Sequence, residues 1–445
     1  MSVTQAMEQY QKILEEEVHD IAWETGAFQR KGKLDAATFV QMIVFGFWQE
    51  PEMRFSGFAQ IGGRREVEVT ESAISQRFTP ACANLFQRIL QRLVEVRVES
   101  EKVDIALLKQ MSAVMVEDST TISLPAELEE IWQGCGGSVG TSEAAVKAFA
   151  QWNVLSGELI GPVLTDGRTN DHRSPFPLED LPEGCLYLAD LGFFGIERLC
   201  LIARGKRKKR YFVTRLQPHT NLYTRSGHKL DIMGILPQKV GQVRELGAVL
   251  GKKNGLPVRL IIVKVPQDVA KARQERIIRN AEKHGNTPSE EVLKMTHWTI
   301  VLTNLPKKRA NYMEILVLLR LRWQIERLFR LWKEDGKIDE WRGKSPYRVL
   351  CEMYAKLCAM VLQQSLIQEG CWLDPYRSIV KAAEALRHEC NRIMVAFYEG
   401  TLEKTVQSVL RVLHSGCRID HRAAQPSTAQ LLLDGLDWEL ELVLT

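Results

Sequence analysis

The chain has 445 residues, of which 45% are hydrophobic, so it can bury a large core and form roughly two to four domains. Its net charge of +4 is mild, so a polyanionic partner must be bound through local basic patches. The nine scattered cysteines include no CxxC pair, which argues against a zinc site and indicates a reducing cytoplasm. The first residues do not resemble a signal peptide, and no apolar run reaches about 18 residues, so we expect a soluble, cytoplasmic protein without a membrane partner.

Residues 1–105 are predicted to be helical, and one short segment among them has features of a DNA reader. A glycine-containing turn at residues 62–65 precedes residues 70–78, which are rich in small polar side chains and include Arg77. Thr79-Pro80 predicts the start of the next helix, because threonine caps helices and proline is favoured at the first helical position. The pattern is typical of a helix-turn-helix in which Arg77 contacts DNA, but ordinary helical bundles contain it too.

Two predicted strands of an α/β unit lead to an aspartate. The apolar run at residues 113–116 is followed by Asp118, and the run at residues 185–189 is followed by Asp190. Acids at the ends of buried strands are where α/β folds place functional groups, although a capping or turn role is the ordinary alternative for either aspartate alone. Two further strands are expected, at residues 146–155 and 159–164.

Residues 205–305 are predicted to form a β-rich insertion that begins with a basic hairpin tip. A basic run is usually only solvated surface, but five cations in six residues before a strand favour contact with phosphates. These cations are Lys206, Arg207, Lys208, Lys209 and Arg210. Strands are expected at residues 211–216, 258–265 and 297–303, and the basic segment 270–294 is expected to be a mobile helix or loop.

Residues 318–337 are predicted to form one long helix, because apolar residues recur at steps of three and four. On another face, a single carboxylate lies among three cations at helical spacing, in the order Arg322, Glu326, Arg330 and Lys333. A solvated stripe of ion pairs is the ordinary interpretation. The excess of positive charge instead favours a carboxylate that holds a divalent metal between phosphate-binding cations.

Asp118, Asp190 and Glu326 together would meet the needs of two-metal phosphoryl transfer. That reaction requires carboxylates from different elements to hold two divalent ions about 4 Å apart, one ion for the attacking oxygen and one for the leaving oxygen. Oxygen ligands favour Mg²⁺ or Mn²⁺ over zinc. Cations on the same helix as Glu326 would then hold the flanking phosphates.

These residues resemble the catalytic core of bacterial insertion-sequence DDE transposases, and more closely the cut-and-paste group with the Tyr-x2-Arg-x3-Glu-x6-Lys signature. Arg322, Glu326 and Lys333 have the spacing of the last three signature residues, and the likeness spans roughly residues 114–341. The resemblance implies an α/β fold with an RNase H-like mixed sheet and a β-rich insertion, flanked by helical N- and C-terminal domains. It also implies DNA cleavage and transfer at transposon ends, with two Mg²⁺ ions and a DNA hairpin intermediate.

The same resemblance implies roles for two further residues and reveals one departure. Trp298 stands where a family tryptophan stacks on a base flipped out near the transposon end, with ordinary core packing as the alternative. Arg215 matches a family arginine that contacts end DNA. The signature tyrosine falls on Leu319, so we expect an active enzyme with altered hairpin handling. The implied partners are double-stranded transposon-end and target DNA, bound by a homodimer associated with the bacterial nucleoid.

Two alternatives remain open at this point. A transposase-derived protein that binds DNA without cutting it would not need the three acids, and a nuclease on the same core would cut without joining. The expected domains are an N-terminal DNA-binding domain (residues 1–105), a catalytic core in two parts (106–204 and 306–344), the insertion (205–305), and a C-terminal domain for dimer and end contacts (345–445).

Overall fold

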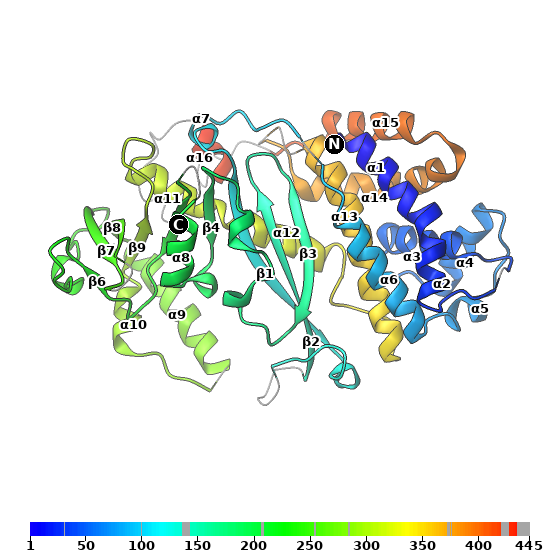
Figure 1. Ribbon diagram of the computed structural model, residues 1–445, viewed down its shortest axis with the longest axis horizontal. Helices are drawn as coiled ribbons and strands as arrows, with labels where there is room; N and C mark the ends of the chain where they lie inside the picture. The colour runs from blue at the N-terminus through cyan, green and yellow to red at the C-terminus, as the bar shows by residue number, and fades with distance from the viewer. Residues whose placement is uncertain are drawn as a thin grey trace.

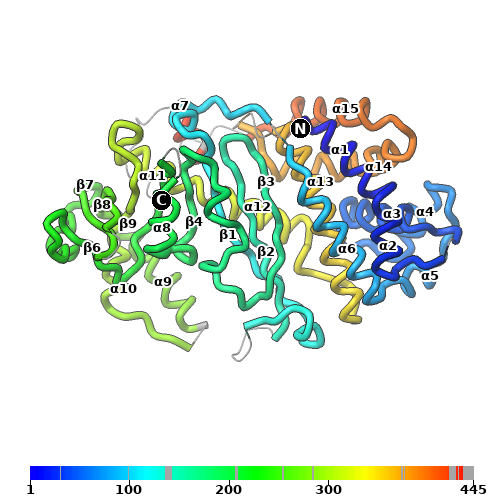
Figure 2. Tube along the Cα trace, in the orientation of Figure 1, coloured from blue at the N-terminus to red at the C-terminus, as the bar shows by residue number. Residues whose placement is uncertain are grey.

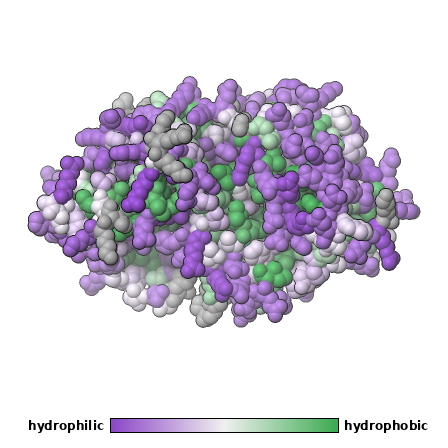
Figure 3. Space-filling model, in the orientation of Figure 1, coloured by the Kyte–Doolittle hydropathy of each residue, from purple (hydrophilic) through white to green (hydrophobic). Residues whose placement is uncertain are grey.

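The computed structural model describes residues 1–30, 32–98, 100–135, 143–205, 209–252, 255–283, 285–371, 374, 376–419 and 427–433. A β-rich end, a central sheet and a helical body follow one another along the longest axis of the molecule (Figure 1). The face in view is mainly hydrophilic, with small hydrophobic patches between the polar side chains (Figure 3). Within the described ranges, no helix combines the length and apolar character that a membrane crossing needs.

The bounds of the elements are as follows. The strands are β1 (Val114–Leu124), β2 (Ala144–Asn153), β3 (Leu159–Asp166), β4 (Leu186–Ala189), β5 (Tyr211–Arg215), β6 (Leu222–Tyr223), β7 (Val243–Leu250), β8 (Leu256–Lys264) and β9 (Trp298–Thr303). The first helices are α1 (Val3–Lys12), α2 (Val18–Glu24), α3 (Ala36–Gln49), α4 (Phe55–Arg64), α5 (Glu71–Ser75), α6 (Pro80–Leu93), α7 (Ala106–Lys109) and α8 (Ile196–Ala203). The later helices are α9 (Gln267–Lys283), α10 (Glu290–Met295), α11 (Tyr312–Leu321), α12 (Trp323–Glu334), α13 (Pro346–Cys371), α14 (Ile379–Glu399), α15 (Leu402–Ser415) and α16 (Thr428–Leu433).

All strands of the described chain belong to one mixed sheet, in the order β3-β2-β1-β4-β5-β9-β8-β7-β6. The pairs β1–β2 and β2–β3 are antiparallel, whereas β4 lies parallel to both β1 and β5. This order and these directions are those of an RNase H-like core, so the predicted fold class is confirmed. Strands β9, β8 and β7 continue the sheet in antiparallel fashion, so the insertion extends the core sheet and does not form a separate layer.

β1 is longer than predicted and continues past Asp118. Its parallel pairing with β4 stops at Glu117, but its antiparallel pairing with β2 continues to Leu124. The polar residues after Asp118 therefore keep a hydrogen-bonded partner strand, and the prediction that the strand ends at Val116 is wrong. Strands β6 and β7 were not predicted, and α9 and α10 form where the sequence predicted a mobile helix or loop.

The basic segment before β5 is not a hairpin. Residues 204–210 connect α8 to β5, and β5 lies parallel to β4. Parallel neighbours require a crossover, which α8 supplies, so the predicted hairpin tip is instead the last part of that crossover. Lys206, Arg207 and Lys208 lie outside the described residues.

The N- and C-terminal helices share one helical body around α13. The Trp48 indole of α3 donates to Gln363 Oε1 of α13 at 2.9 Å, and the hydroxyls of Tyr10 and Ser365 are 2.8 Å apart. α13 is buried on all sides along most of its length, as expected for a helix at the centre of a bundle. Blue N-terminal and orange C-terminal segments lie side by side in this body (Figure 2).

The helix start predicted at Thr79-Pro80 is present, and Thr70 caps a second helix nearby. The Thr70 side chain accepts a hydrogen bond from the Ala73 amide at the start of α5. The Thr79 side chain caps α6 in the same way, with Pro80 at its first position. These caps fix two short connections in the helical body, and they occur in helical bundles and DNA-reading helices alike.

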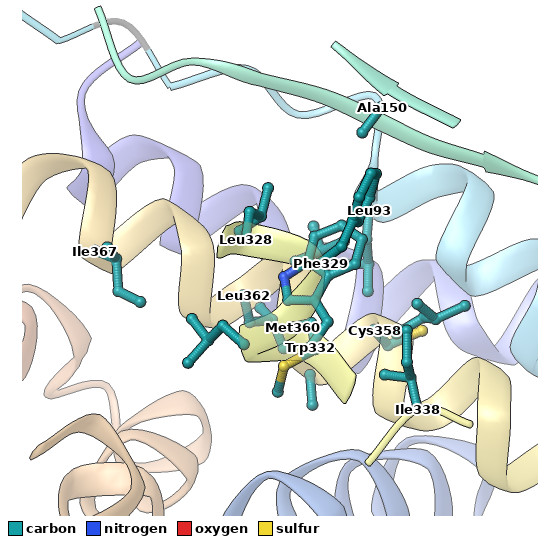
Figure 4. Close-up of a cluster of buried hydrophobic side chains, with 14 of the residues drawn as sticks. Leu93, Ala150, Leu328, Phe329, Trp332, Ile338, Cys358, Met360, Leu362 and Ile367 are labelled. Carbon is teal, nitrogen blue, oxygen red and sulfur yellow. The ribbon is translucent and has the colours of Figure 1, made fainter. Parts of the chain in front are cut away.

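α12 lies between the sheet and α13, and its apolar face fixes its orientation. Phe329 and Trp332 are 5% and 1% exposed, and they meet Leu93 of α6, Ala150 of β2 and Met360 of α13 (Figure 4). Burial of each large apolar side chain contributes about 1.5–3 kcal/mol, so this contact holds α12 firmly against the sheet. The polar face of α12 is thereby left toward the central strands.

Candidate active site

Topology brings Asp118 and Asp190 together. The parallel pairing of β1 with β4 ends where Glu117 faces Ala189, and the next residue of each chain segment is an aspartate. Because side chains alternate along a strand, both aspartates lie on the sheet face whose apolar residues pack against α11 and α12. The two acids predicted from separate strands are therefore neighbours in register.

Arg215 continues the same row onto the next strand. Leu188 of β4 faces Val213 of β5, so Arg215, two residues further on, takes the position beside Asp190 on the same face. An arginine that sequence similarity alone had singled out thus stands one strand away from the aspartate pair.

Glu326 reaches this row from α12, and Arg322 connects it to Asp190. The segment at residues 318–337 is not one continuous helix, because the helix is interrupted at Arg322, whose N–H donates to Arg320 O. Apolar spacing predicts helical residues but not a local break in the backbone hydrogen bonds, which is why the interruption was not predicted. The Arg322 guanidinium pairs with Glu326 through Nη1, and its Nε is 3.8 Å from Asp190 Oδ1.

The charges of the site are unbalanced toward the acids. Burial raises the pKa of Asp118 to about 7, and the carboxylates of Asp190 and Glu326 act in the same direction. The Ser119 amide, which donates to Asp118 Oδ1 at 2.8 Å, and the Arg322 guanidinium oppose this rise. Burial lowers the pKa of Arg322, but the three acids outweigh it and raise that pKa overall.

The donor set fits a hard divalent cation. Asp118, Asp190 and Glu326 offer carboxylate oxygens from three different elements, which are the ligands that Mg²⁺ and Mn²⁺ prefer. No three acidic, histidine or cysteine side chains in the described ranges are grouped closely enough to hold a metal ion. Arg322 lies between Asp190 and Glu326, so coordination by all three acids requires this guanidinium to move aside.

The other two predicted cations of α12 lie further from the acids. Lys333 Nζ donates to Thr121 O at 2.8 Å and is 3.5 Å from Asp339 Oδ2, so it fastens α12 to β1. Arg330 is exposed, with its guanidinium carbon 5.8 Å from the centre of the Trp323 ring. Arg322 alone among the three predicted phosphate-binding cations of α12 pairs with a site acid, and DNA contact by Arg330 and Lys333 stays a prediction.

Trp298 lies on the opposite face of the sheet from the acids. It packs with Ile300 and Leu302 in the hydrophobic core on that face and is 8% exposed. Its indole N–H donates to Pro237 O at 2.8 Å, and Lys264 Nζ is 4.5 Å from the ring centre. This packing agrees with the core role that the sequence left open. Base stacking stays a prediction, and it would require the covered ring to become accessible.

Arg210 has a structural environment. It is 5% exposed, and its Nη atoms donate to Leu178 O and Glu179 O at 2.9 Å and to Glu183 Oε1 at 3.3 Å. Its guanidinium therefore ties the start of β5 to the loop before β4. Lys209, next to it, is exposed. DNA contact by either residue stays a prediction.

Arg77 and Leu319 also have packing roles in the structure. The Arg77 guanidinium lies 4.4 Å from the centre of the Phe28 ring, and burial lowers its pKa. Leu319 is 9% exposed in α11, where it forms part of the main core. The signature position that carries Leu319 therefore contributes an apolar side chain to packing against the sheet.

A buried ion-pair network that the sequence analysis missed lies directly behind the aspartates. Glu117 is fully buried on the sheet face opposite to Asp118, and it accepts hydrogen bonds from Gln151 Nε2, Tyr187 Oη and Arg198 Nη2 at 2.9–3.1 Å. The only sequence signal for it was a charged residue directly after the apolar run at residues 113–116. The network joins β1, β2, β4 and α8 at the level of the site.

A second missed group fixes the loop after Asp190. Asp171 accepts a hydrogen bond from Ser119 Oγ at 2.8 Å and pairs with Lys147 Nζ at 3.2 Å. A Cβ atom at Gly192 would lie 2.5 Å from Asp171 Oδ2, so a larger residue here would displace either this loop or the Asp171 carboxylate. Nothing local in the sequence relates Asp171 to Gly192, so this contact could not be predicted.

Comparison with known proteins shows which family this chain matches. Residues 110–362 match the protein family described as "Transposase DDE domain", and this range contains all three acids. The chain is 24% identical to the transposase of insertion sequence IS231E from Bacillus thuringiensis subsp. finitimus over 317 residues, which are 67% of this chain and 65% of that protein. It is 23% identical to the transposase of IS1151 from Clostridium perfringens over 377 residues, 79% and 78% of the two chains.

Two further similarities are a shorter sequence match and a solved structure. The putative transposase InsL of IS186A from Escherichia coli (strain K12) is 28% identical over 220 residues, 47% of this chain and 59% of that protein. A cryo-EM structure of the piggyBac transposase synaptic complex with hairpin DNA aligns with a TM-score of 0.45 and 10% identity, covering 94% of this chain and 87% of that one. Because the family match covers more than half of its length, the chain belongs to the transposase DDE-domain family.

Proposed function

We propose that this chain binds the terminal repeats of its own element, cuts them by metal-dependent phosphoryl transfer and joins them to target DNA. The observation that supports this most strongly is the register of β1 and β4, which makes Asp118 and Asp190 neighbours. Arg322 then connects Asp190 to Glu326, so three acids from three elements surround one cation. DNA binding alone would not require this arrangement of acids.

Asp118, Asp190 and Glu326 are proposed to hold Mg²⁺, with Mn²⁺ as a substitute. Two such ions, when bound, supply activation of the attacking oxygen and stabilisation of the leaving oxygen. The protein's contribution is to hold three carboxylates on rigid elements and to neutralise the charge of the phosphate. Arg322 would be free to contact DNA once bound cations neutralised Asp190 and Glu326. Its guanidinium fork is well suited to donate paired hydrogen bonds to a DNA phosphate.

Double-stranded DNA is the proposed partner at both steps, first as transposon ends and then as target. Recognition of two ends implies a homodimer on DNA, in which one subunit cuts the end that its partner holds. The dimer is measurable as a 2:2 protein–DNA complex by light scattering at saturating terminal-repeat DNA. A 1:1 complex that still yields joined products would overturn this part of the proposal.

The reaction is tested with the duplex of the terminal inverted repeat that flanks the coding sequence, labelled on both strands and incubated with Mg²⁺. We expect nicked, hairpin and joined products from the wild type and none from Asp118→Asn or Asp190→Asn. Cutting without joined products would establish a nuclease instead. Tight binding without any cutting by the wild type would establish a DNA-binding protein derived from a transposase.

A further inference from the structure

Helix α9 of the insertion packs on the same face of the sheet as the three acids. Ala270 of α9 is fully buried in the main core, together with Val265 just before the helix and Val301 of β9. The polar side chains of α9 that turn toward the sheet are therefore directed to the strand positions beside the acid row.

Arg273 is held next to Arg215. Arg215 of β5 faces Val301 of β9, and Thr299 lies two positions along β9 on the same face. Arg273 Nη2 donates to Thr299 Oγ1 at 3.1 Å, which fixes the guanidinium over this part of the sheet. Arg276 follows one helical turn later, on the same side of α9 as Arg273.

These three arginines form a cluster of like charge. Burial lowers the pKa of Arg273 to about 10, and the nearby guanidinium groups of Arg215 and Arg276 act in the same direction. The register of β5 with β9 and the Arg273–Thr299 hydrogen bond place Arg273 near Arg215, and helical spacing places Arg276 beside Arg273. Across the described ranges, no acidic side chain forms an ion pair with Arg215, Arg273 or Arg276.

The nearest acids are occupied by a different cation. Burial lowers the pKa of Arg215, Arg322 and Arg276 lower it further, and Asp190 and Glu326 oppose them. Both of these acids already pair with Arg322. Partly buried cations without a counter-ion are costly, and such groups concentrate at sites where a ligand supplies the missing charge.

We propose that Arg215, Arg273 and Arg276 form one phosphate-binding site that holds a DNA backbone phosphate adjacent to the one being cut. This inference rests on the proposed function, because it assumes that the scissile phosphate lies at the acid row. Neighbouring strands are about 4.8 Å apart, so Arg215 lies one strand from Asp190 and two from Asp118. A DNA strand that crosses the sheet at this level meets the acids and then the arginine cluster. The insertion thus contributes to the site through α9 as well as through its strands.

The guanidinium group suits this ligand. Arginine presents several N–H donors in a rigid fork that matches two phosphate oxygens, and it remains charged even when its pKa is lowered. Contact with the backbone carries no base information, so the site would position the strand without selecting a sequence.

The test compares Arg273→Gln, Arg276→Gln and the double variant with the wild type, using fluorescence anisotropy of the terminal-repeat duplex over a KCl series without metal. Each lost phosphate contact should lower the slope of log K against log[KCl] by about 0.9 and weaken binding about fivefold or more at a fixed salt concentration. Lys271→Gln is the matched control, because Lys271 is an exposed cation on the far side of α9. It should leave the slope unchanged relative to the wild type.

The position of the bound phosphate on the DNA is tested by replacing single phosphates near the cleavage point with neutral methylphosphonates. For the wild type, replacement at one position adjacent to the cut should weaken binding, and the same replacement should weaken binding by the double variant much less, because only Arg215 of the site remains. An equal penalty in both proteins, or unchanged salt slopes in the arginine variants, would overturn the site.

Two controls keep this outcome separate from other failures. Wild-type cleavage of the same duplex with Mg²⁺ is measured in parallel, and its absence would count against the proposed function and not against α9 alone. Removal of one like charge should leave the Tm of the DNA-free protein unchanged or raise it. If the double variant fails to fold, the salt slope of Arg276→Gln alone is the test, because Arg276 is exposed and its replacement should not disturb folding.

Discussion

Adjacent residues of β1 serve two different purposes because strand side chains alternate. Asp118 faces the site, whereas Glu117 points into the opposite core, where Arg198, Tyr187 and Gln151 satisfy it. A buried carboxylate without such partners would be strongly unfavourable. The residue before the first aspartate therefore supports the site from behind.

Glu117→Ala should strongly destabilise the protein, because it leaves the Arg198 guanidinium buried without its counter-ion. Loss of one partner of a buried ion pair costs about 3–5 kcal/mol, so the free energy of unfolding in urea should fall by about that amount. The double variant Glu117→Met, Arg198→Met should recover much of this loss, because no unpaired charge remains. Equal stability of the single and double variants would contradict the account.

Lys356 of α13 should make stability depend on alkaline pH. Its buried ammonium donates to Lys337 O at 3.1 Å and to Glu340 O at 2.7 Å, and burial lowers its pKa to about 8. In the unfolded chain the pKa is about 10.4, so the unfolded state binds more protons between these values. Stability therefore rises with pH from about 8 to 10.4, by roughly 2–3 kcal/mol from this group.

Lys356→Met should abolish this rise, which is measured as the difference between the urea unfolding curves of wild type and variant at several pH values. Other lysines, tyrosines and cysteines titrate in the same range, and the difference between the two proteins cancels their contribution. Parallel pH profiles for wild type and variant would show that Lys356 keeps an ordinary pKa in the folded protein.

At the scale of elements, the loop after β4 depends on a contact with a distant loop. Gly192 lies so close to Asp171 that an added Cβ would be 2.5 Å from Oδ2, and Asp171 is itself held by Ser119 and Lys147. A substitution must therefore shift either the loop that begins at Asp190 or the Asp171 carboxylate with its contacts to Ser119 and Lys147.

Gly192→Ala should lower the DNA cleavage rate about 10- to 100-fold, because misplacement of a reacting group by about 1 Å has an effect of this size. Gly195→Ala is the matched control, since its Cβ would meet no atom closer than 3.5 Å. Single-turnover cleavage of terminal-repeat DNA measures both. Equal rates for the two variants would show that the Asp171 contact does not position Asp190.

The central strands could be predicted because each is a short apolar run, and the meeting of Asp118 with Asp190 followed from the rule that parallel strands end at one edge. The interruption at Arg322 could not be predicted, because apolar spacing says nothing of a break in the backbone hydrogen bonds. The face of Trp298 and the site of Arg273 depend on the register of β9 with β5 and β8, which is set by contacts distant in sequence. Local patterns therefore found the acids but not the residues that support them.

At the scale of the molecule, the two ends of the chain share a core that local patterns could not reveal. Trp48 and Tyr10 bond to Gln363 and Ser365, more than 300 residues away, and α13 lies between the N- and C-terminal helices. The sequence predicted a helical segment at each end as a separate domain, because helical periodicity reports an apolar face but not what covers it.

Residues 1–105 expressed alone should therefore not fold stably, because the apolar faces of α3 and α6 would lose α13. Circular dichroism with thermal melting should show no cooperative transition for this fragment. Co-expression with residues 345–433 should restore one. A cooperative melt of the isolated fragment would establish that the N-terminal helices form an independent domain.

The central claim is that Asp118, Asp190 and Glu326 form one active site. It is tested most directly by single-turnover cleavage of labelled terminal-repeat DNA in Mg²⁺, comparing wild type, Glu326→Gln and Glu334→Gln. Glu334 is an exposed acid on the same helix, two turns further on, and serves as the matched control. We expect Glu334→Gln to cut like the wild type, and Glu326→Gln to bind the DNA but leave it intact. Undiminished cleavage by Glu326→Gln would contradict the account.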